Sequence, residues 1–262
     1  MSAKIPLKGL ANAALGSLGL EVYTSVRNAA LKLENLKALA NTPFRDFFNS
    51  DQVYVFHHIP RSGGTSVTRV IRNWFWVVRD YRPGGERDQS FFENRKDVSS
   101  LKNYKCLAGH FGVDGCYLCQ RYPEMLTDDR FRIFTFVRDP LETKISLYYY
   151  EKKHGLNVGV TLEEHLMGRP NYIANRLPCT KDNYRSVLDR YYFVGITELA
   201  QESLDKLADL VCRPRIKVSV VNRADRDEQV SALSPAVMRR FRSENELDYL
   251  IYEYCLEKAR AY

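Results

Sequence analysis

Residues 53 to 66 read Val-Tyr-Val-Phe-His-His-Ile-Pro-Arg-Ser-Gly-Gly-Thr-Ser and carry the strongest structural signal in the chain. The first four residues are an apolar run of strand formers, and apolar residues at helical spacing follow the glycines as far as Val78. We therefore predict a buried strand, a tight loop at Gly63 and Gly64, and a helix. Such a loop lets the backbone approach a ligand closely, and a helix start offers N–H groups to a phosphate or sulfate.

A nucleoside-triphosphate P-loop is the first alternative for this stretch. That loop requires G-x-x-x-x-G-K-[ST], because a lysine after the second glycine reaches the terminal phosphates. The chain contains no Gly-Lys dipeptide. Its basic residue, Arg61, precedes the glycines instead, and Thr65 and Ser66 add two hydroxyls. The loop must therefore hold an anion in a different way.

An arginine follows a second predicted strand, residues 132–137. Asp139 is suited to the N-cap of a helix and Pro140 to its first position. Arg138 would then project from the carboxyl end of a strand, where open α/β sheets bind ligands. Ser146 lies two helical turns further along the chain.

A histidine follows a third predicted strand, residues 104–108, in the sequence Gly109-His110-Phe111-Gly112. Histidine titrates near neutrality, so His110 is a candidate general base. A further strand is predicted at residues 191–198, with a helix behind it. The alternation of strands and helices indicates an α/β fold, with a central, mainly parallel sheet flanked by helices.

Residues 58–66 resemble the His-Ile-Pro-Lys-Thr-Gly-Gly-Thr-Ser loop of sulfotransferases that use 3′-phosphoadenosine 5′-phosphosulfate (PAPS). In that family the loop holds the 5′-phosphosulfate. The resemblance implies cofactor contacts from six residues of this loop: Arg61, Ser62, Gly63, Gly64, Thr65 and Ser66. Residues 136–140 with Ser146 resemble the element that binds the 3′-phosphate, which implies that role for Arg138 and Ser146. The Gly-His position resembles the catalytic histidine of carbohydrate sulfotransferases, which implies that His110 is the base.

Three further segments resemble the same family. In all, the resemblance covers roughly residues 52–258. Residues 193–198 match its Phe-Val-Gly-Ile-Thr-Glu segment. Residues 171–177 are similar to an Asn-x-x-Thr-Arg-x-Leu stretch, with Asn175 at the place of the usual threonine. Residues 217–223 resemble the loop that closes over the cofactor, which implies contacts from Asn222 and Arg223.

The resemblance implies a P-loop-like sulfotransferase fold with PAPS across the carboxyl ends of the strands. It implies transfer of the sulfuryl group to a hydroxyl, on a carbohydrate or glycolipid, without a metal and with 3′,5′-bisphosphoadenosine as product. Arg61 departs from the family, which has lysine there. An arginine can stabilise charge on the leaving phosphate but cannot donate a proton, so its role in catalysis would be electrostatic. Two alternatives stay open, namely a catalytically silent PAPS-fold binding protein and a nucleotide-dependent phosphotransferase.

Composition agrees with this interpretation. The 262 residues are 45% hydrophobic, which is enough to fill the core of one α/β domain, and the formal net charge is +7. No RNA-binding signature or zinc-finger spacing is present, so nucleic acid is not a predicted partner. Cys116 and Cys119 have the spacing of metal ligands, but no second pair follows, and we predict reduced cysteines without a metal.

Residues 1–51 are predicted as an N-terminal helical extension, and residues 52–262 as the sulfotransferase domain. The longest charge-free run of the extension, residues 9–20, is too short to span a membrane. Its helices would pack on the domain or lie on a membrane surface, and packing is favoured. Family members of the Golgi usually carry a membrane anchor, so a bacterial-type cytoplasmic enzyme, with peripheral membrane contact at most, is expected.

Residues 79–103 are rich in charge, glycine and proline and show no sustained period, which predicts a long loop. We place acceptor recognition in this loop and near Trp74, Trp76 and residues 148–150, because aromatic side chains suit stacking on sugars; aromatic residues at helical spacing are more often part of the core, so the sequence does not identify the acceptor.

Overall fold

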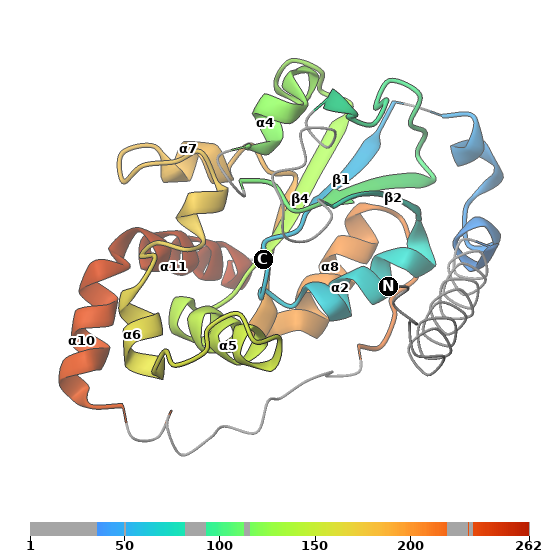
Figure 1. The fold of residues 1–262 in the computed structure, drawn as a ribbon. Coiled ribbons are helices and arrows are strands. Elements are labelled where there is room, and N and C mark those ends of the chain that lie inside the picture. The colour runs from blue at the N-terminus through green and yellow to red at the C-terminus, as the bar shows by residue number, and fades with distance from the viewer. Residues whose placement is uncertain are drawn as a thin grey trace, which may run out of the picture.

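The computed structural model describes residues 36–49, 51–81, 93–112, 116–218, 230 and 233–261. Within these ranges five strands form one sheet in the order β2-β3-β1-β4-β5, and every pairing is parallel (Figure 1). The strands are β1 (Val53–His57), β2 (Trp76–Asp80), β3 (Lys105–Gly109), β4 (Phe131–Val137) and β5 (Phe193–Ile196). The predicted α/β class with a parallel central sheet is confirmed.

The central strand β1 fixes where the loops leave the sheet. His57 pairs with Gly109 of β3 on one side and with Thr135 of β4 on the other. All five residues of β1 are buried, as expected for a parallel strand that is covered on both faces. The loops after β1, β3 and β4 therefore emerge beside one another at the carboxyl edge.

Helices cover both faces of the sheet. On one face, α2 (Gly64–Trp74) and α8 (Ala200–Leu210) lie side by side and share a core cluster with Tyr54 and Phe56 (Figure 1). Val53 and Val55 point the other way, into a cluster formed with α4 (Leu118–Arg121) and the turn that follows it.

A group of helices extends beyond the carboxyl edge of the sheet (Figure 1). It contains α5 (Pro140–Lys153), α6 (Leu162–Met167), α10 (Pro235–Glu244) and α11 (Glu246–Arg260). The short α7 (Tyr184–Leu188) packs against α11. As predicted, Asp139 caps α5, because its side chain accepts a hydrogen bond from the Glu142 N–H, and Pro140 is the first helical residue.

The helix after the glycine loop is shorter than predicted. It ends at Trp74, and Trp76–Asp80 forms the edge strand β2, where Val77 pairs with Cys106 of β3. The prediction of a helix through Val78 was wrong because tryptophan and valine also favour strands, and the open edge of β3 offered them hydrogen-bond partners. The predicted loop at residues 79–103 accordingly begins with two strand residues.

The described end of the predicted N-terminal extension packs on the sheet domain. Ala38 is fully buried, and the Asp46 carboxylate pairs with Arg213 at 2.9 Å with both side chains buried. The boundary at residue 51 stays a prediction. No helix among the described residues combines the length and the apolar character that a membrane crossing requires.

A buried ion pair connects the end of β2 to the layer of α4. The Asp80 carboxylate accepts hydrogen bonds from Arg121 Nε at 2.6 Å and from the Tyr122 hydroxyl at 2.7 Å. The Asp80 and Arg121 side chains are each 2% exposed.

We expect Asp80→Ala to lower the free energy of unfolding by about 3–5 kcal/mol, because it removes the carboxylate from a buried guanidinium. Urea denaturation measures the change. The control is Asp209→Ala, which removes the partner of Arg215 from an exposed pair of 2.6 Å and should leave the free energy of unfolding nearly unchanged. Equal effects of the two variants would contradict this account.

Candidate active site

A cavity of about 450 Å³ lies at the carboxyl edge of the sheet and brings the predicted segments together. Its lining comes from the glycine loop, the end of β3, the β4–α5 boundary and the turn near residue 174. The lining residues are His58, Pro60, Arg61, Gly63, Gly64, Thr65, Ser66, His110, Arg138, Ser146, Leu147, Tyr150, Tyr172 and Arg176. Eight of the predicted site residues are in this set: Arg61, Gly63, Gly64, Thr65, Ser66, His110, Arg138 and Ser146.

The glycine loop requires both of its glycines. Gly63 precedes α2 with φ at +73°, and a Cβ there would come within 3.0 Å of Thr197. A Cβ on Gly64 would lie 1.6 Å from Nε2 of His58, so the imidazole rests directly on the start of α2. Gly63 has no side chain to cap the helix, and the first N–H groups of a helix lack intrahelical acceptors. The start of α2 can therefore offer N–H groups to an anion in the cavity.

Two arginines meet at the side of the cavity next to α5. Arg61 donates two hydrogen bonds to Ser146 Oγ, from Nε at 3.1 Å and from Nη2 at 2.8 Å. Arg138 pairs with Glu142 at 3.1 Å, and its Nη1 donates to the Arg61 carbonyl at 3.4 Å. Burial, followed by the charge of Arg138, lowers the pKa of Arg61.

The direction of Arg61 differs from the one predicted. Its guanidinium contacts Ser146, which the sequence placed at the 3′-phosphate end, although Arg61 itself was expected at the phosphosulfate. Its planar group also lies 4.9 Å from the centre of the Tyr150 ring. Arg61, Arg138 and Ser146 thus form one cationic cluster.

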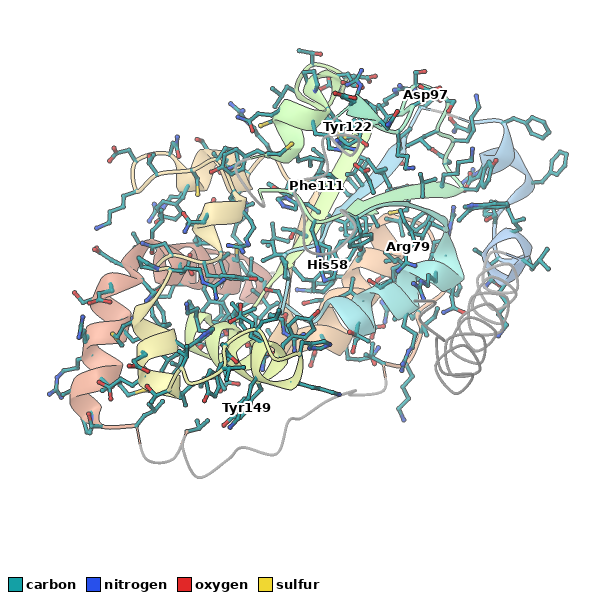
Figure 2. All side chains as sticks on the ribbon, in the orientation of Figure 1. His58, Arg79, Asp97, Phe111, Tyr122 and Tyr149 are labelled. Carbon is teal, nitrogen blue, oxygen red and sulfur yellow. The ribbon has the colours of Figure 1, made fainter. Side chains whose placement is uncertain are left out.

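Two histidines form a contact at the opposite side of the glycine loop. His110 Nε2 lies 3.1 Å from Nδ1 of His58, and the Tyr81 hydroxyl lies 3.2 Å from the same Nδ1 (His58 and the neighbouring Phe111 are labelled in Figure 2). Burial lowers the pKa of His58 to about 3, with smaller effects from neighbouring charges. Burial, and then the charge of Arg176, lowers the pKa of His110 to about 4. Both rings are therefore neutral at pH 7.

The cavity includes residues to which the sequence gave no role. His58 is the contact partner of His110, whereas His57 is buried and lies 2.7 Å from the Tyr191 hydroxyl. Tyr172 and Arg176 also line the cavity. In the sequence, only the resemblance of residues 171–177 to a family stretch pointed to Arg176, and that resemblance did not indicate a role for it.

Several predicted residues lie elsewhere. Ser62 is 1% exposed and does not line the cavity. Asn222 and Arg223 fall outside the described residues. Trp74 is fully buried, with Nε1 donating to the Pro214 carbonyl, and Tyr148 is buried between α5 and α6. The prediction that these two aromatic residues contact an acceptor was therefore wrong, because both side chains are buried in the hydrophobic core.

The remaining aromatic and cysteine positions are partly accessible. Tyr150 lines the cavity and is 41% exposed, and Trp76 on β2 is 40% exposed. All six cysteines carry free thiols. Within the described ranges, no group of three or more potential ligands is placed to hold a metal ion.

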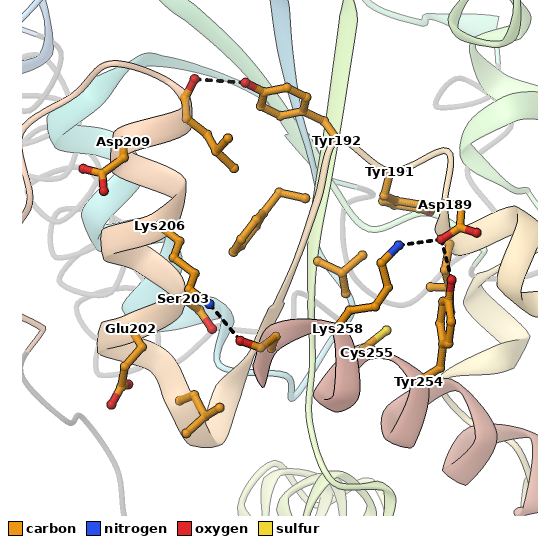
Figure 3. Close-up of a pocket in the computed structure, with 16 residues that line it drawn as sticks. Asp189, Tyr191, Tyr192, Glu202, Ser203, Lys206, Asp209, Tyr254, Cys255 and Lys258 are labelled. Atoms are coloured by element: carbon orange, nitrogen blue, oxygen red, sulfur yellow. Dashed lines mark hydrogen bonds and ion pairs between the residues drawn. The ribbon is translucent and has the colours of Figure 1, made fainter. Parts of the chain in front are cut away.

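A second cavity, of about 500 Å³, lies at the edge strand β5 between α8 and α11 (Figure 3). Three of its charged groups bind another lining residue or the backbone. Asp189 accepts from Lys258 and from the Tyr254 hydroxyl, both at 2.6 Å, and Lys206 donates to the Ala259 carbonyl at 2.7 Å. No predicted site residue lines it.

Comparison with known proteins identifies the fold. No protein-family model matches the chain, and no curated protein matches it. The structure of mouse sulfotransferase SULT7A1 complexed with PAP matches with a TM-score of 0.51 and 16% identity, over 80% of this chain and 91% of that one. The chain has the sulfotransferase fold. A sulfotransferase from Alicyclobacillus acidocaldarius matches less well, with a TM-score of 0.48 and 13% identity, over 78% of this chain and 95% of that one.

We expect neither His58 nor His110 to titrate between pH 5.5 and 8. Their pKa values are lowered from 6.5, so both rings lose their protons below this range and stay neutral throughout it. Histidine-selective NMR across this pH range measures the change, and the variants His58→Gln and His110→Gln assign the signals. A midpoint near 6.5 for either ring in the wild-type protein would show that the ring is not desolvated as described.

Proposed function

We propose that this protein is a sulfotransferase that uses PAPS and transfers its sulfuryl group to an acceptor hydroxyl. The observation that carries the proposal is the arrangement of one cavity. A helix start with two obligatory glycines, a cluster of two arginines and a serine, and a neutral histidine pair all face it. The cavity volume of about 450 Å³ lies within the usual range for small-molecule sites.

The residues fit a ligand that carries two anionic groups. The glycine loop suits one group, since Gly63 leaves the start of α2 without a side-chain cap. Arg61, Arg138 and Ser146 suit the other. Two guanidinium groups held near each other repel, and an anion between them would relieve that repulsion. We therefore assign the 3′-phosphate of PAPS to this cluster, including Arg61.

When bound, PAPS would supply the activated sulfuryl group. His110 would accept the proton of the acceptor hydroxyl as its oxygen attacks sulfur. Because His110 Nε2 faces His58, its Nδ1 is the nitrogen that remains for this proton. The lowered pKa keeps the base unprotonated, and the N–H groups at the start of α2 would orient the transferred group.

We extend the proposal to a carbohydrate or glycolipid acceptor. Tyr150 is the support, because it lines the cavity and exposes 41% of its surface, so that a sugar face can stack on its ring. The acceptor proposal is independent of the proposal that PAPS is the donor, and a screen of acceptor compounds tests it.

Calorimetric titration tests the donor assignment. We expect 3′,5′-bisphosphoadenosine (PAP) to bind more tightly than ATP, with an affinity that does not change when magnesium is added. The reason is that the cationic cluster of Arg61, Arg138 and Ser146 suits a 3′-phosphate, which PAP carries and ATP lacks. Tighter, magnesium-dependent binding of ATP would instead indicate a phosphotransferase and would overturn the proposal.

We expect His110→Ala to lower the rate of sulfuryl transfer by about 10²–10⁴-fold, because it removes the base. Transfer is measured with radiolabelled PAPS and a panel of sugar acceptors. The affinity for PAP should stay within about threefold of wild type, because the predicted PAP contacts lie in other residues. Undiminished turnover would exclude His110 as the base, and failure of the wild-type protein to label any acceptor would favour a silent binding protein.

A further inference from the structure

Arg176 lines the cavity and has no ion-pair partner among the residues that the structure describes. It ends the turn η3 (Ala174–Arg176), and its guanidinium carbon lies 3.5 Å from the centre of the Tyr172 ring. Nη1 donates to the Tyr172 carbonyl at 2.7 Å, and Nε is buried with no hydrogen-bond partner in the described part of the chain. No carboxylate within the described ranges comes within ion-pair distance of it. A buried donor that lacks an acceptor is costly, so its persistence needs a reason.

The surrounding backbone holds Arg176 in place. Asp248 of α11 accepts hydrogen bonds from the N–H groups of Ile173 at 3.0 Å and Ala174 at 2.7 Å. A Cβ on Gly112 would come within 2.5 Å of the Arg176 Cα, so the loop after His110 presses against this turn. Asp248 therefore uses its oxygen atoms on the turn and makes no ion pair with the guanidinium, although its charge raises the pKa of Arg176 against the larger, lowering effect of burial.

The position of Arg176 relates it to the reacting end of the proposed site. Gly112, which contacts its backbone, lies two residues after His110. The charge of Arg176 is also the second cause, after burial, of the lowered pKa of His110. Arg61, in contrast, is engaged with Ser146. The turn thus supplies a cation that lines the same cavity as the base and whose charge acts on it.

We propose that Arg176 binds the 5′-phosphosulfate end of the donor and stabilises the negative charge that develops there during transfer. This inference rests on the proposed function. In the step, a bond forms between the acceptor oxygen and sulfur while the bond from sulfur to the bridging oxygen breaks. The electron pair stays on that oxygen of the 5′-phosphate, next to Arg176, and the acceptor proton passes to His110. The sequence had given this electrostatic role to Arg61.

Nucleotide fragments separate the two ends of the site. The probes are PAP, adenosine 5′-monophosphate and adenosine 3′-monophosphate, titrated calorimetrically into the wild-type protein, Arg176→Met and the matched variant Arg61→Met. Arg176→Met should weaken PAP and the 5′-monophosphate by about 10- to 100-fold and leave the 3′-monophosphate within about threefold. Arg61→Met should show the reverse preference, with the loss confined to PAP and the 3′-monophosphate.

The outcomes distinguish the inference from the function on which it rests. If the wild-type protein does not bind PAP, the proposed function fails. If it binds PAP but Arg176→Met leaves the 5′-monophosphate unaffected, or weakens both fragments equally, the assignment of Arg176 is overturned. Should the methionine variant not fold, as judged by circular dichroism, Arg176→Gln keeps a polar group at this position and is measured in its place with the same expected pattern.

Discussion

The parallel pairing of β1 between β3 and β4 is the constraint on which the candidate site depends. His57 and Gly109, the last residues of β1 and β3, are level with each other and with Thr135, two residues before β4 ends, so three chain segments leave the sheet near one another. This register brings His58 against His110, and the loop of Arg61 beside Arg138, across 52 and 77 positions of sequence. Gly109 permits the end of β3 to lie close to the end of β2, because a Cβ there would be 2.4 Å from the Asp80 carbonyl oxygen.

Charge and burial then divide the cavity into two kinds of environment. Desolvation lowers the pKa of Arg61 and of Arg176, but both keep their charge because a guanidinium is not deprotonated in proteins. The histidines respond in the opposite sense. Their ordinary pKa is near 6.5, so the same burial leaves His58 and His110 uncharged. One low-dielectric cavity thus holds permanent cations for anions and a neutral ring that can take a proton.

Local sequence patterns were enough to predict β1, the glycine loop and the Asp139 cap, because each of these depends on neighbouring residues, whereas the family resemblance gave the site roles of eight residues that line the cavity. Contacts between segments that are distant in the sequence could not be predicted from local patterns. The edge strand at Trp76 required the partner β3, and the contact of His58 with His110 required the sheet register. Ser62 was assigned with its loop, although the chain turns its side chain inward. The direction of a side chain within a motif is set by packing, which spacing does not encode.

Arg61 shows why the direction of a side chain within a motif matters for the chemistry of the site. A lysine ammonium is a single point on a flexible stem, whereas the Arg61 fork donates from two nitrogens to one hydroxyl, Ser146 Oγ. Because the guanidinium of Arg61 is bound to Ser146, it belongs to the cluster with Arg138. A site that transfers sulfuryl groups would then need another cation near the base. Tyr172 connects the two places, because it lies against the guanidinium of Arg176 and its interaction with Arg61 raises the Arg61 pKa. Under the proposed function, the departure at position 61 and the guanidinium of Arg176, which forms no ion pair within the described residues, have one explanation, a redistribution of positive charge along the cavity.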